Sequence, residues 1–237
     1  MMLIVMVLPL FVACGSDSDD NDNGGSNGGA AKNKRVAKIV TEDGGNIYDY
    51  TYFYDEQNRV VKVVTKEYSD SPSETVRTYQ YGETVIVVNQ KVEGIRNGGE
   101  SYSRSWTRTY TLDNGLIIKD KDTQGGSETY TYDSNGYMKT NGSSQLVWNN
   151  GNLMKVSNTT YDYSNTPWVN IGLKLISGTD GNLGIPGYYG KMPKMMPSKI
   201  GDKTYQYTVE GGLLTKVMIY YTEKGYDQIS INNITWE

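Results

Sequence analysis

The chain has 237 residues, 23 basic and 27 acidic side chains, and a formal net charge of −4. It contains no histidine and a single cysteine, Cys14. Because nucleic-acid binding needs a basic surface, we expect no nucleic-acid partner. The missing imidazoles exclude histidine-dependent hydrolases and the usual zinc sites, so we also expect no cofactor and no bound metal. Any acid–base chemistry would fall to carboxylates, lysines or tyrosines.

The N-terminus reads as a targeting segment. An uncharged apolar run ends at Cys14; it is too short for a transmembrane helix and has the length of a signal-peptide core. Small residues flank the cysteine in the phrase VACG, which resembles the lipobox of bacterial lipoproteins. The resemblance implies that residues 1–13 are a signal peptide and that Cys14 becomes the lipid-modified first residue. The alternative is an ordinary secretory signal with an incidental cysteine.

Residues 14–33 read as a tether, acidic at first and then glycine-rich. The acids that follow the cysteine resemble the surface-export signal of Bacteroidota lipoproteins; they are Asp17, Asp19, Asp20 and Asp22. We therefore expect an outer-membrane lipoprotein at the cell surface, joined to the membrane by its lipid. The alternative is a plain acidic spacer on a lipoprotein that faces the periplasm. The run also matches half of an EF-hand loop, but Ala30 replaces the required glutamate, so we expect no calcium site.

The remainder, 34–237, repeats one phrase, as in YTYFYDEQNRVVKVV at 50–64 and TYTYDSNGYMKT at 129–140. Aromatic residues two apart follow the strand period, and Asn-Gly dipeptides are typical of hairpin turns. We predict at least five β-hairpins, with further strands near 35–41, 76–81, 84–92, 101–111 and 228–236. The expected fold is a single all-β domain, an antiparallel meander that forms a curled or partly closed barrel-like sheet.

The phrase SRSWTRTYTL shows how the two faces of this sheet should differ. Trp106 and Tyr110 alternate with serines and threonines, and Arg108 shares the aromatic face. One face is therefore aromatic and the other hydroxylic, as in a sheet with a single solvated side. The chain has 21 tyrosines and 2 phenylalanines, and tyrosine suits such a sheet because its ring packs while its hydroxyl bonds to water.

The hairpin pattern breaks at 164–203, where proline, glycine and methionine replace tyrosine and threonine. A short helix is expected near 170–176. An insertion of this length inside a domain is often functional. We expect it either to plug or cover one end of the sheet or to present an exposed binding edge.

Taken together, the lipoprotein leader, the Tyr-rich Y-x-Y-D-x-x-G hairpins, the insertion and the terminal ISINNITW resemble a Bacteroidota lipoprotein family of uncharacterised function. The resemblance implies a porin-like fold of curled antiparallel strands. The hairpins are also similar to the YD repeats of Rhs-type wall proteins. Neither resemblance carries a catalytic residue over to this chain, and we expect no enzyme.

Candidate ligand-binding residues are the aromatics of the insertion, Trp168, Tyr188 and Tyr189. The strand tryptophans read instead as core or sheet-face residues; they are Trp106, Trp148 and Trp236. Four aspartates occupy turn positions, where local hydrogen bonding explains them; they are Asp55, Asp113, Asp133 and Asp180.

Three functions follow from this reading. The first is a non-catalytic binding module that captures a glycan or another nutrient at the envelope. The second is a structural role, or an interaction with an envelope protein. The least favoured is a glycoside hydrolase, which would need two inward-facing carboxylates within reach of a common cleft.

Overall fold

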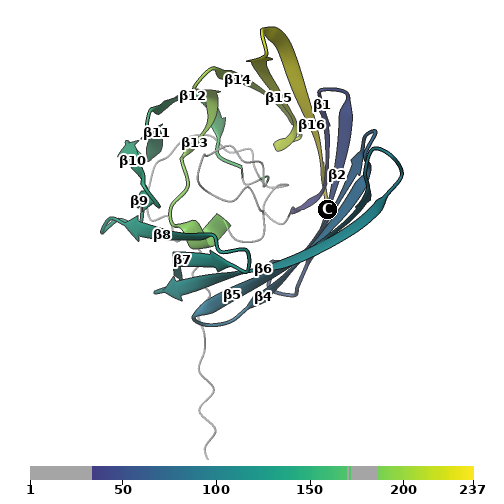
Figure 1. Cartoon of the computed structure of the whole chain (residues 1–237). Helices are drawn as coiled ribbons and strands as arrows, with labels where there is room; N and C mark the ends of the chain where they lie inside the picture. The colour runs from purple at the N-terminus through teal and green to yellow at the C-terminus, as the bar shows by residue number, and fades with distance from the viewer. Residues whose placement is uncertain (1–33, 170, 172–185) are drawn as a thin grey trace, which may run out of the picture.

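The computed structural model describes residues 34–169, 171 and 186–237. Sixteen antiparallel strands follow one another along the chain, each paired with the next, and β16 returns to pair with β1 (Figure 1). The strands are β1 (Val36–Asp43), β2 (Asn46–Tyr54), β3 (Val60–Tyr68), β4 (Ser73–Tyr81), β5 (Val85–Ile95), β6 (Ser101–Asp113), β7 (Leu116–Asp122), β8 (Ser127–Tyr132), β9 (Met138–Asn141), β10 (Ser144–Asn149), β11 (Asn152–Val156), β12 (Thr159–Pro167), β13 (Met195–Ile200), β14 (Lys203–Glu210), β15 (Leu213–Glu223) and β16 (Tyr226–Trp236).

The sheet is a closed barrel. The closing ladder runs from Val36 opposite Trp236 to Asp43 opposite Ser230. Closure removes the unpaired strand edges that an open meander would expose to other chains. The predicted all-β meander is therefore confirmed, and its closure is complete.

The aromatic face of the sheet points inward. Tyr52 lies opposite Val63, and Tyr79 lies opposite Val88; all four side chains are buried. The hydroxylic face points outward, and on β6 it presents the alternating residues Ser103, Ser105, Thr107, Thr109 and Thr111. This division follows from the two-residue period of a strand, which sends successive side chains to opposite faces.

A ring of aromatic side chains stabilises the end of the barrel where β1 begins and β16 finishes. Each lies on an even-numbered strand and donates a hydrogen bond to a carbonyl oxygen in the first half of the preceding strand. The pairs are Tyr54 with Val36, Tyr81 with Val60, Tyr132 with Ile117, Trp148 with Met138, Tyr163 with Leu153, Tyr207 with Pro197 and Trp236 with Leu214. We call these donors the aromatic belt. Phenylalanine has no donor for this bond, which gives a structural reason for the preference for tyrosine.

The turn aspartates act as expected. Asp55 Oδ1 accepts hydrogen bonds from the backbone N–H groups of Gln57 (3.0 Å) and Arg59 (2.8 Å). Asp133 repeats this arrangement six strands later, in the β8–β9 turn. The turn at Asn114 and Gly115 has positive φ at both residues, 48° and 77°, as a tight hairpin requires.

The insertion is narrower than expected. Strand β12 continues to Pro167 and β13 begins at Met195, so the segment between them is 168–194. It contains a 3-10 helix, Pro186–Tyr189. The helix expected near 170–176 falls outside the described residues, except for Ile171, which is buried. Among the described residues, no helix is long and apolar enough to cross a membrane.

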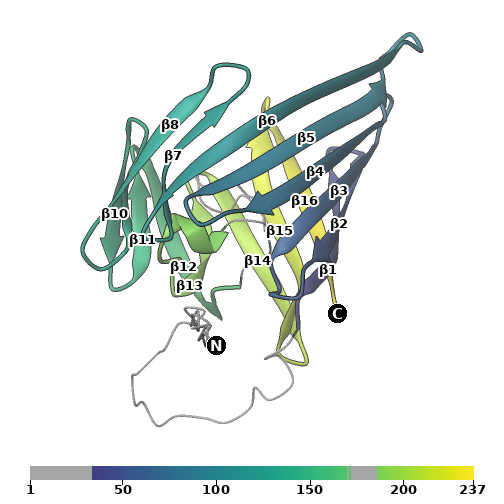
Figure 2. The same cartoon turned by 90° about the horizontal axis from the view of Figure 1, so that it is seen from below.

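The two ends of the barrel differ in shape. Strands β3–β6 reach beyond their neighbours at the end opposite the C-terminus (Figure 2). We call this the open end, and the other the belt end.

Candidate functional site

The aromatic residues of the insertion pack onto the inside of the barrel. Tyr189 is 2% exposed and lies edge-to-face on Tyr130, with ring centroids 5.5 Å apart. Tyr188 is half-buried and stacks on Tyr81 of the belt at 6.0 Å. Trp168 is also half-buried against the core. Of the two alternatives for the insertion, the burial of Tyr189 agrees with a plug and not with an exposed edge, because Tyr130 supplies an inward aromatic partner.

Trp168, Tyr188 and Tyr189 each pack against the core, which agrees with the first of the two expected arrangements, a plug or cover. Their role in ligand binding stays a prediction. The four aspartates after Cys14, Cys14 itself and Asp180 lie outside the described residues.

Polar and aromatic side chains line the inner face above the buried layer, towards the open end. Trp106 lies on the inward face of β6 between Arg104 and Arg108, and in register opposite Gln90 of β5. Gln90 in turn accepts a 2.8 Å hydrogen bond from Arg77 Nε of β4. Trp106 is half-exposed and Arg104 is exposed. We call Arg77, Gln90, Arg104 and Trp106 the inner wall.

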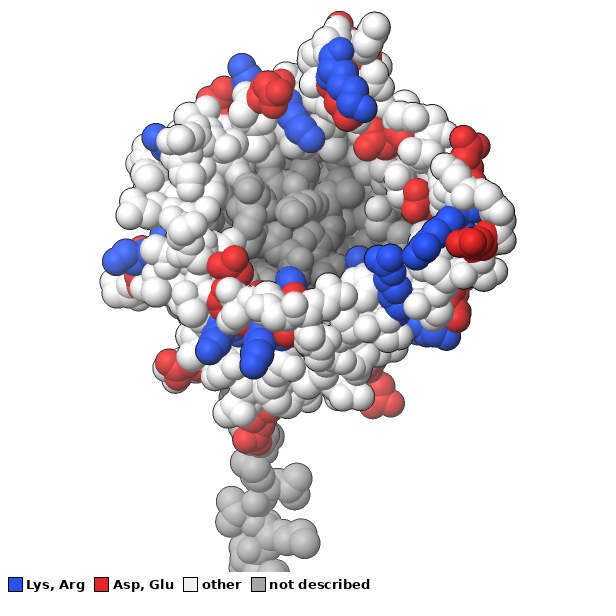
Figure 3. All heavy atoms as spheres, in the orientation of Figure 1, with Lys and Arg blue, Asp and Glu red and all other residues white. Residues whose placement is uncertain are grey.

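The molecule is hollowed at this end, as Figure 3 shows. The inner wall combines one indole ring with guanidinium and amide groups that converge from three adjacent strands. Such a mixture of an apolar surface with a few hydrogen-bonding groups is typical of small-molecule sites.

The sequence interpretation placed Trp106 with the other strand tryptophans and did not select it as a candidate site residue. The indole N–H groups of Trp148 and Trp236 donate to backbone carbonyls at 2.7 Å and thus serve the belt. Trp106 lies far along its strand from that end. The available signal was the R-x-W-x-R phrase, which puts two guanidinium groups on the face of one indole.

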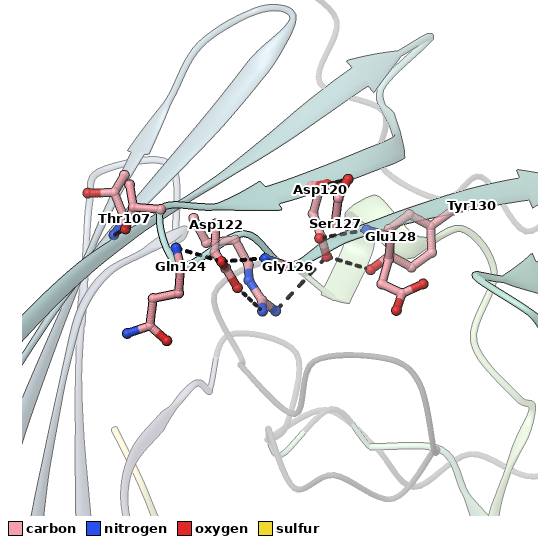
Figure 4. Close-up of polar contacts among 10 residues, drawn as sticks. Thr107, Asp120, Asp122, Gln124, Gly126, Ser127, Glu128 and Tyr130 are labelled. Atoms are coloured by element: carbon pink, nitrogen blue, oxygen red, sulfur yellow. Dashed lines mark hydrogen bonds and ion pairs between the residues drawn. The ribbon is translucent and has the colours of Figure 1, made fainter.

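A cluster of charged side chains beside Trp106 joins neighbouring strands through ion pairs and hydrogen bonds (Figure 4). Arg108 Nη2 lies 3.2 Å from an Asp122 carboxylate oxygen, and its Nη1 lies 4.0 Å from Asp120. Asp120 is buried and accepts hydrogen bonds from the Tyr130 hydroxyl (2.7 Å) and the Glu128 backbone N–H (3.2 Å). The cluster therefore ties β6, β7 and β8 together.

Asp122 also closes the turn that follows β7. Its Oδ1 accepts 2.9 Å bonds from the backbone N–H groups of Gln124 and Gly126. The Gly126 N–H and the Arg108 guanidinium hold the pKa of Asp122 below its usual range, because both stabilise the charged carboxylate. Burial raises the pKa of Tyr130, with Tyr189 and Asp120 adding to the effect, so its hydroxyl remains a donor to Asp120.

Asp120 and Asp122 are thus two inward-facing carboxylates, the feature that a hydrolase would need. Each, however, accepts several hydrogen bonds, and both lie against Arg108. An acid–base pair for glycoside hydrolysis needs one carboxyl that is protonated, yet the surroundings of Asp122 favour its charged form. Among the described residues, no three acidic or cysteine side chains gather in a way that could hold a metal ion.

The outward face of the barrel carries charged side chains. Its ion pairs include Lys38–Asp49 at 2.7 Å, Lys66–Glu74 at 3.7 Å and Lys91–Glu93 at 2.7 Å. A barrel that spans a membrane has an outward apolar band and a polar interior. Here most of the buried aromatic residues face inward, and ion pairs and hydroxyl groups lie on the outward face.

Comparison with known proteins gives one structural likeness. A porin-like protein from Bacteroides vulgatus matches with a TM-score of 0.34 and 11% sequence identity, over 85% of this chain and 98% of that one. A scan against protein-family models and a search of curated proteins find no match.

Proposed function

We propose that this chain is a cell-envelope lipoprotein that acts as a non-catalytic binding module and takes a glycan at the inner wall. The observation that carries the proposal is Trp106, half-exposed and flanked on the same face by Arg104 and opposite Gln90. An indole offers a flat apolar surface for the C–H face of a sugar ring. The guanidinium and amide groups beside it can hydrogen-bond to sugar hydroxyls.

The charged side chains on the outward face support the proposal that the barrel lies in water. Charged groups such as Lys38 and Asp49 would cost several kcal/mol in contact with lipid at the bilayer midplane, about 2–4 kcal/mol for each lysine. The lipid at Cys14, and not the barrel wall, would then hold the protein to the membrane. We propose that the acids after Cys14 direct it to the cell surface.

The non-catalytic part of the proposal is supported by the cluster around Arg108. Asp120 and Asp122 are engaged in hydrogen bonds and ion pairs that join β6, β7 and β8. We therefore do not propose a hydrolase.

Calorimetric titration of the purified protein with neutral and acidic oligosaccharides tests the proposal. We expect Trp106→Ala to weaken binding about tenfold or more, since an aromatic anchor is a typical hot spot. The matched control is Phe53→Ala, because Phe53 is 45% exposed but points outward. Unchanged affinity in Trp106→Ala would overturn the inner-wall site.

If the wild-type protein binds no saccharide, the envelope-partner alternative takes the lead. It predicts that a defined envelope protein co-purifies with the tagged lipoprotein.

The location of the protein is tested separately by proteinase shaving of intact cells. The native chain should be cleaved, and a variant with Asp17, Asp19, Asp20 and Asp22 all changed to alanine should be protected.

A further inference from the structure

The flared ends of β3–β6 carry a concavity in addition to the hollow at the open end of the barrel. It is an open groove of about 660 Å³, well within the size range of small-molecule sites. It is lined by residues of two neighbouring hairpin ends: Lys66, Glu67, Tyr68, Pro72, Ser73, Glu74, Glu93, Gly94, Ile95, Ser101, Tyr102 and Ser103. By strand alternation most of these residues belong to the outward face, so we call it the outer groove. Gly94 and Tyr102 belong to the inward face, and the Arg104 guanidinium of the inner wall lies 5.8 Å from the Tyr102 ring centroid, so the groove adjoins the inner wall.

Exposed apolar side chains concentrate at this groove. Tyr68 is 52% exposed and Ile95 is 44% exposed. Ile47, which is 42% exposed, lies directly across the ladder from Tyr68. Single exposed apolar residues are normal, but a group on adjacent strands beside a concavity marks a binding surface.

The polar groups of the groove favour a neutral ligand with many hydroxyls. On the outward face, Glu74 lies 3.7 Å from Lys66 and Glu93 lies 2.7 Å from Lys91, so both carboxylates are paired with a lysine. A surface on which the charges balance offers no net attraction to an anionic ligand. Carboxylates and the nearby serine hydroxyls can nevertheless accept and share hydrogen bonds with sugar hydroxyls.

Gly94 sets the shape of the groove. A Cβ on this residue would lie 2.8 Å from the carbonyl oxygen of Pro72 and 2.9 Å from the phenol oxygen of Tyr102. The absence of a side chain therefore lets the Tyr102 ring pack directly against β5. The backbone N–H of Ile95 donates a 3.0 Å bond to the same Pro72 carbonyl, which joins the two hairpin ends. The groove is thus formed by backbone contacts and needs no ligand to create it.

We propose that the outer groove is a second saccharide subsite. It takes a neutral sugar unit stacked on Tyr68, with hydroxyls bonded to Glu74 and Glu93. Because the groove is open, it suits a segment of a longer glycan better than an enclosed monosaccharide. This inference rests on the proposed function, in that the ligand class is the same, but it uses different residues.

The test is calorimetric titration with neutral hexasaccharides of glucan, mannan and xylan type, and with a uronic acid hexasaccharide of matched length. We expect two binding events for a neutral probe. Tyr68→Ala should remove one of them and Trp106→Ala the other. Tyr226→Ala is the matched control, because Tyr226 is 73% exposed on the β15–β16 hairpin and does not line the groove.

The possible failures can be told apart. If Trp106→Ala abolishes all binding and Tyr68→Ala changes nothing, the outer groove is overturned while the proposed function stands. If only Tyr68→Ala loses binding, the groove stands and the inner wall does not. No saccharide binding by the wild-type protein overturns both.

Two further results would also overturn the groove assignment. Tighter binding of the uronic acid probe than of the neutral probes, lost in Tyr68→Ala, would contradict the charge argument. A change from dimer to monomer in Tyr68→Ala by light scattering, with saccharide binding intact, would make the groove an interface between copies of this chain.

Discussion

The hydroxyl of Tyr163 on β12 donates a 2.7 Å hydrogen bond to the carbonyl oxygen of Leu153 on β11. The ring is half-buried and the leucine is fully buried, so water has little access to this carbonyl. Six other belt pairs repeat the relationship around the barrel. The exception is β6, which has the buried Leu112 in the same place of its repeat. Each belt bond therefore gives one backbone carbonyl of the preceding strand a side-chain donor.

Tyr163→Phe should destabilise the barrel while keeping its packing. The ring remains, so the loss is that of the hydrogen bond, about 1 kcal/mol, rising to about 3 kcal/mol if the carbonyl is left unpaired. Urea unfolding followed by circular dichroism measures the difference. Tyr226→Phe is the control, because Tyr226 is exposed at a hairpin tip, and its change should be within about 0.5 kcal/mol. Equal stability of Tyr163→Phe and wild type would show that the belt bonds do not contribute.

Belt residues on different strands should also contribute independently. Tyr54 bonds to Val36 and Tyr163 bonds to Leu153, and the two pairs share no partner. The double variant Tyr54→Phe, Tyr163→Phe should therefore lose the sum of the two single losses within about 0.5 kcal/mol. A coupling energy well above that value would mean that the belt acts as one connected unit.

Local features of the sequence predicted the strands well, because the two-residue period and the turn chemistry at Asp55 and Asp133 act over a few residues. Closure depends instead on Val36 meeting Trp236 at the far end of the chain, and no local pattern specifies it. Local sequence patterns were equally limited in predicting the site residues, because these depend on contacts between distant parts of the chain. Trp106 and Trp148 have similar strand settings, and only the assembled barrel separates an indole at the belt from one near the open end. The sequence left both a plug and an exposed edge open for Tyr189, because its partner, Tyr130, is distant in sequence.

Alkaline pH should unfold the barrel cooperatively. Burial raises the pKa of Tyr54 and that of Tyr205 to about 12 each, against about 10 in an unfolded chain. The folded state retains these protons when the unfolded state loses them. The stability that the two tyrosines contribute is therefore complete below about pH 10 and is lost as the pH rises towards 12.

Absorbance at the tyrosinate band, recorded together with circular dichroism, checks this expectation. A fraction of the tyrosines should ionise only as the secondary structure is lost. Complete ionisation with a midpoint near pH 10, while circular dichroism stays native, would contradict it. Tyr54→Phe should reduce the pH dependence of stability in this range.

Asp122 should contribute stability that acid removes. Its pKa is lowered by the Gly126 N–H and by Arg108, so its contribution is present above the ordinary carboxyl pKa, about 4, and is lost as the pH falls through the lower folded value. Asp122→Asn should therefore lower the urea midpoint at neutral pH, with a smaller difference from wild type near pH 3. Glu100→Gln, at an exposed residue in the β5–β6 turn, is the control. A constant difference at both pH values would argue against this linkage.

Gly94→Ala should disturb the flared ends of β4–β6 and leave the belt end intact. The new methyl group would meet the Pro72 carbonyl, which is backbone and cannot turn away, and the Tyr102 ring. We expect a loss of about 1–3 kcal/mol, as for other overpacked sites. Gly187→Ala is the matched control, because a Cβ there meets nothing within 4 Å. Hydrogen exchange should increase at the ends of β4–β6 and remain unchanged at the belt end, because the clash is confined to the flared strands. Faster exchange throughout the barrel would instead mean that Gly94 stabilises the whole fold. The variant would then not perturb the outer groove selectively.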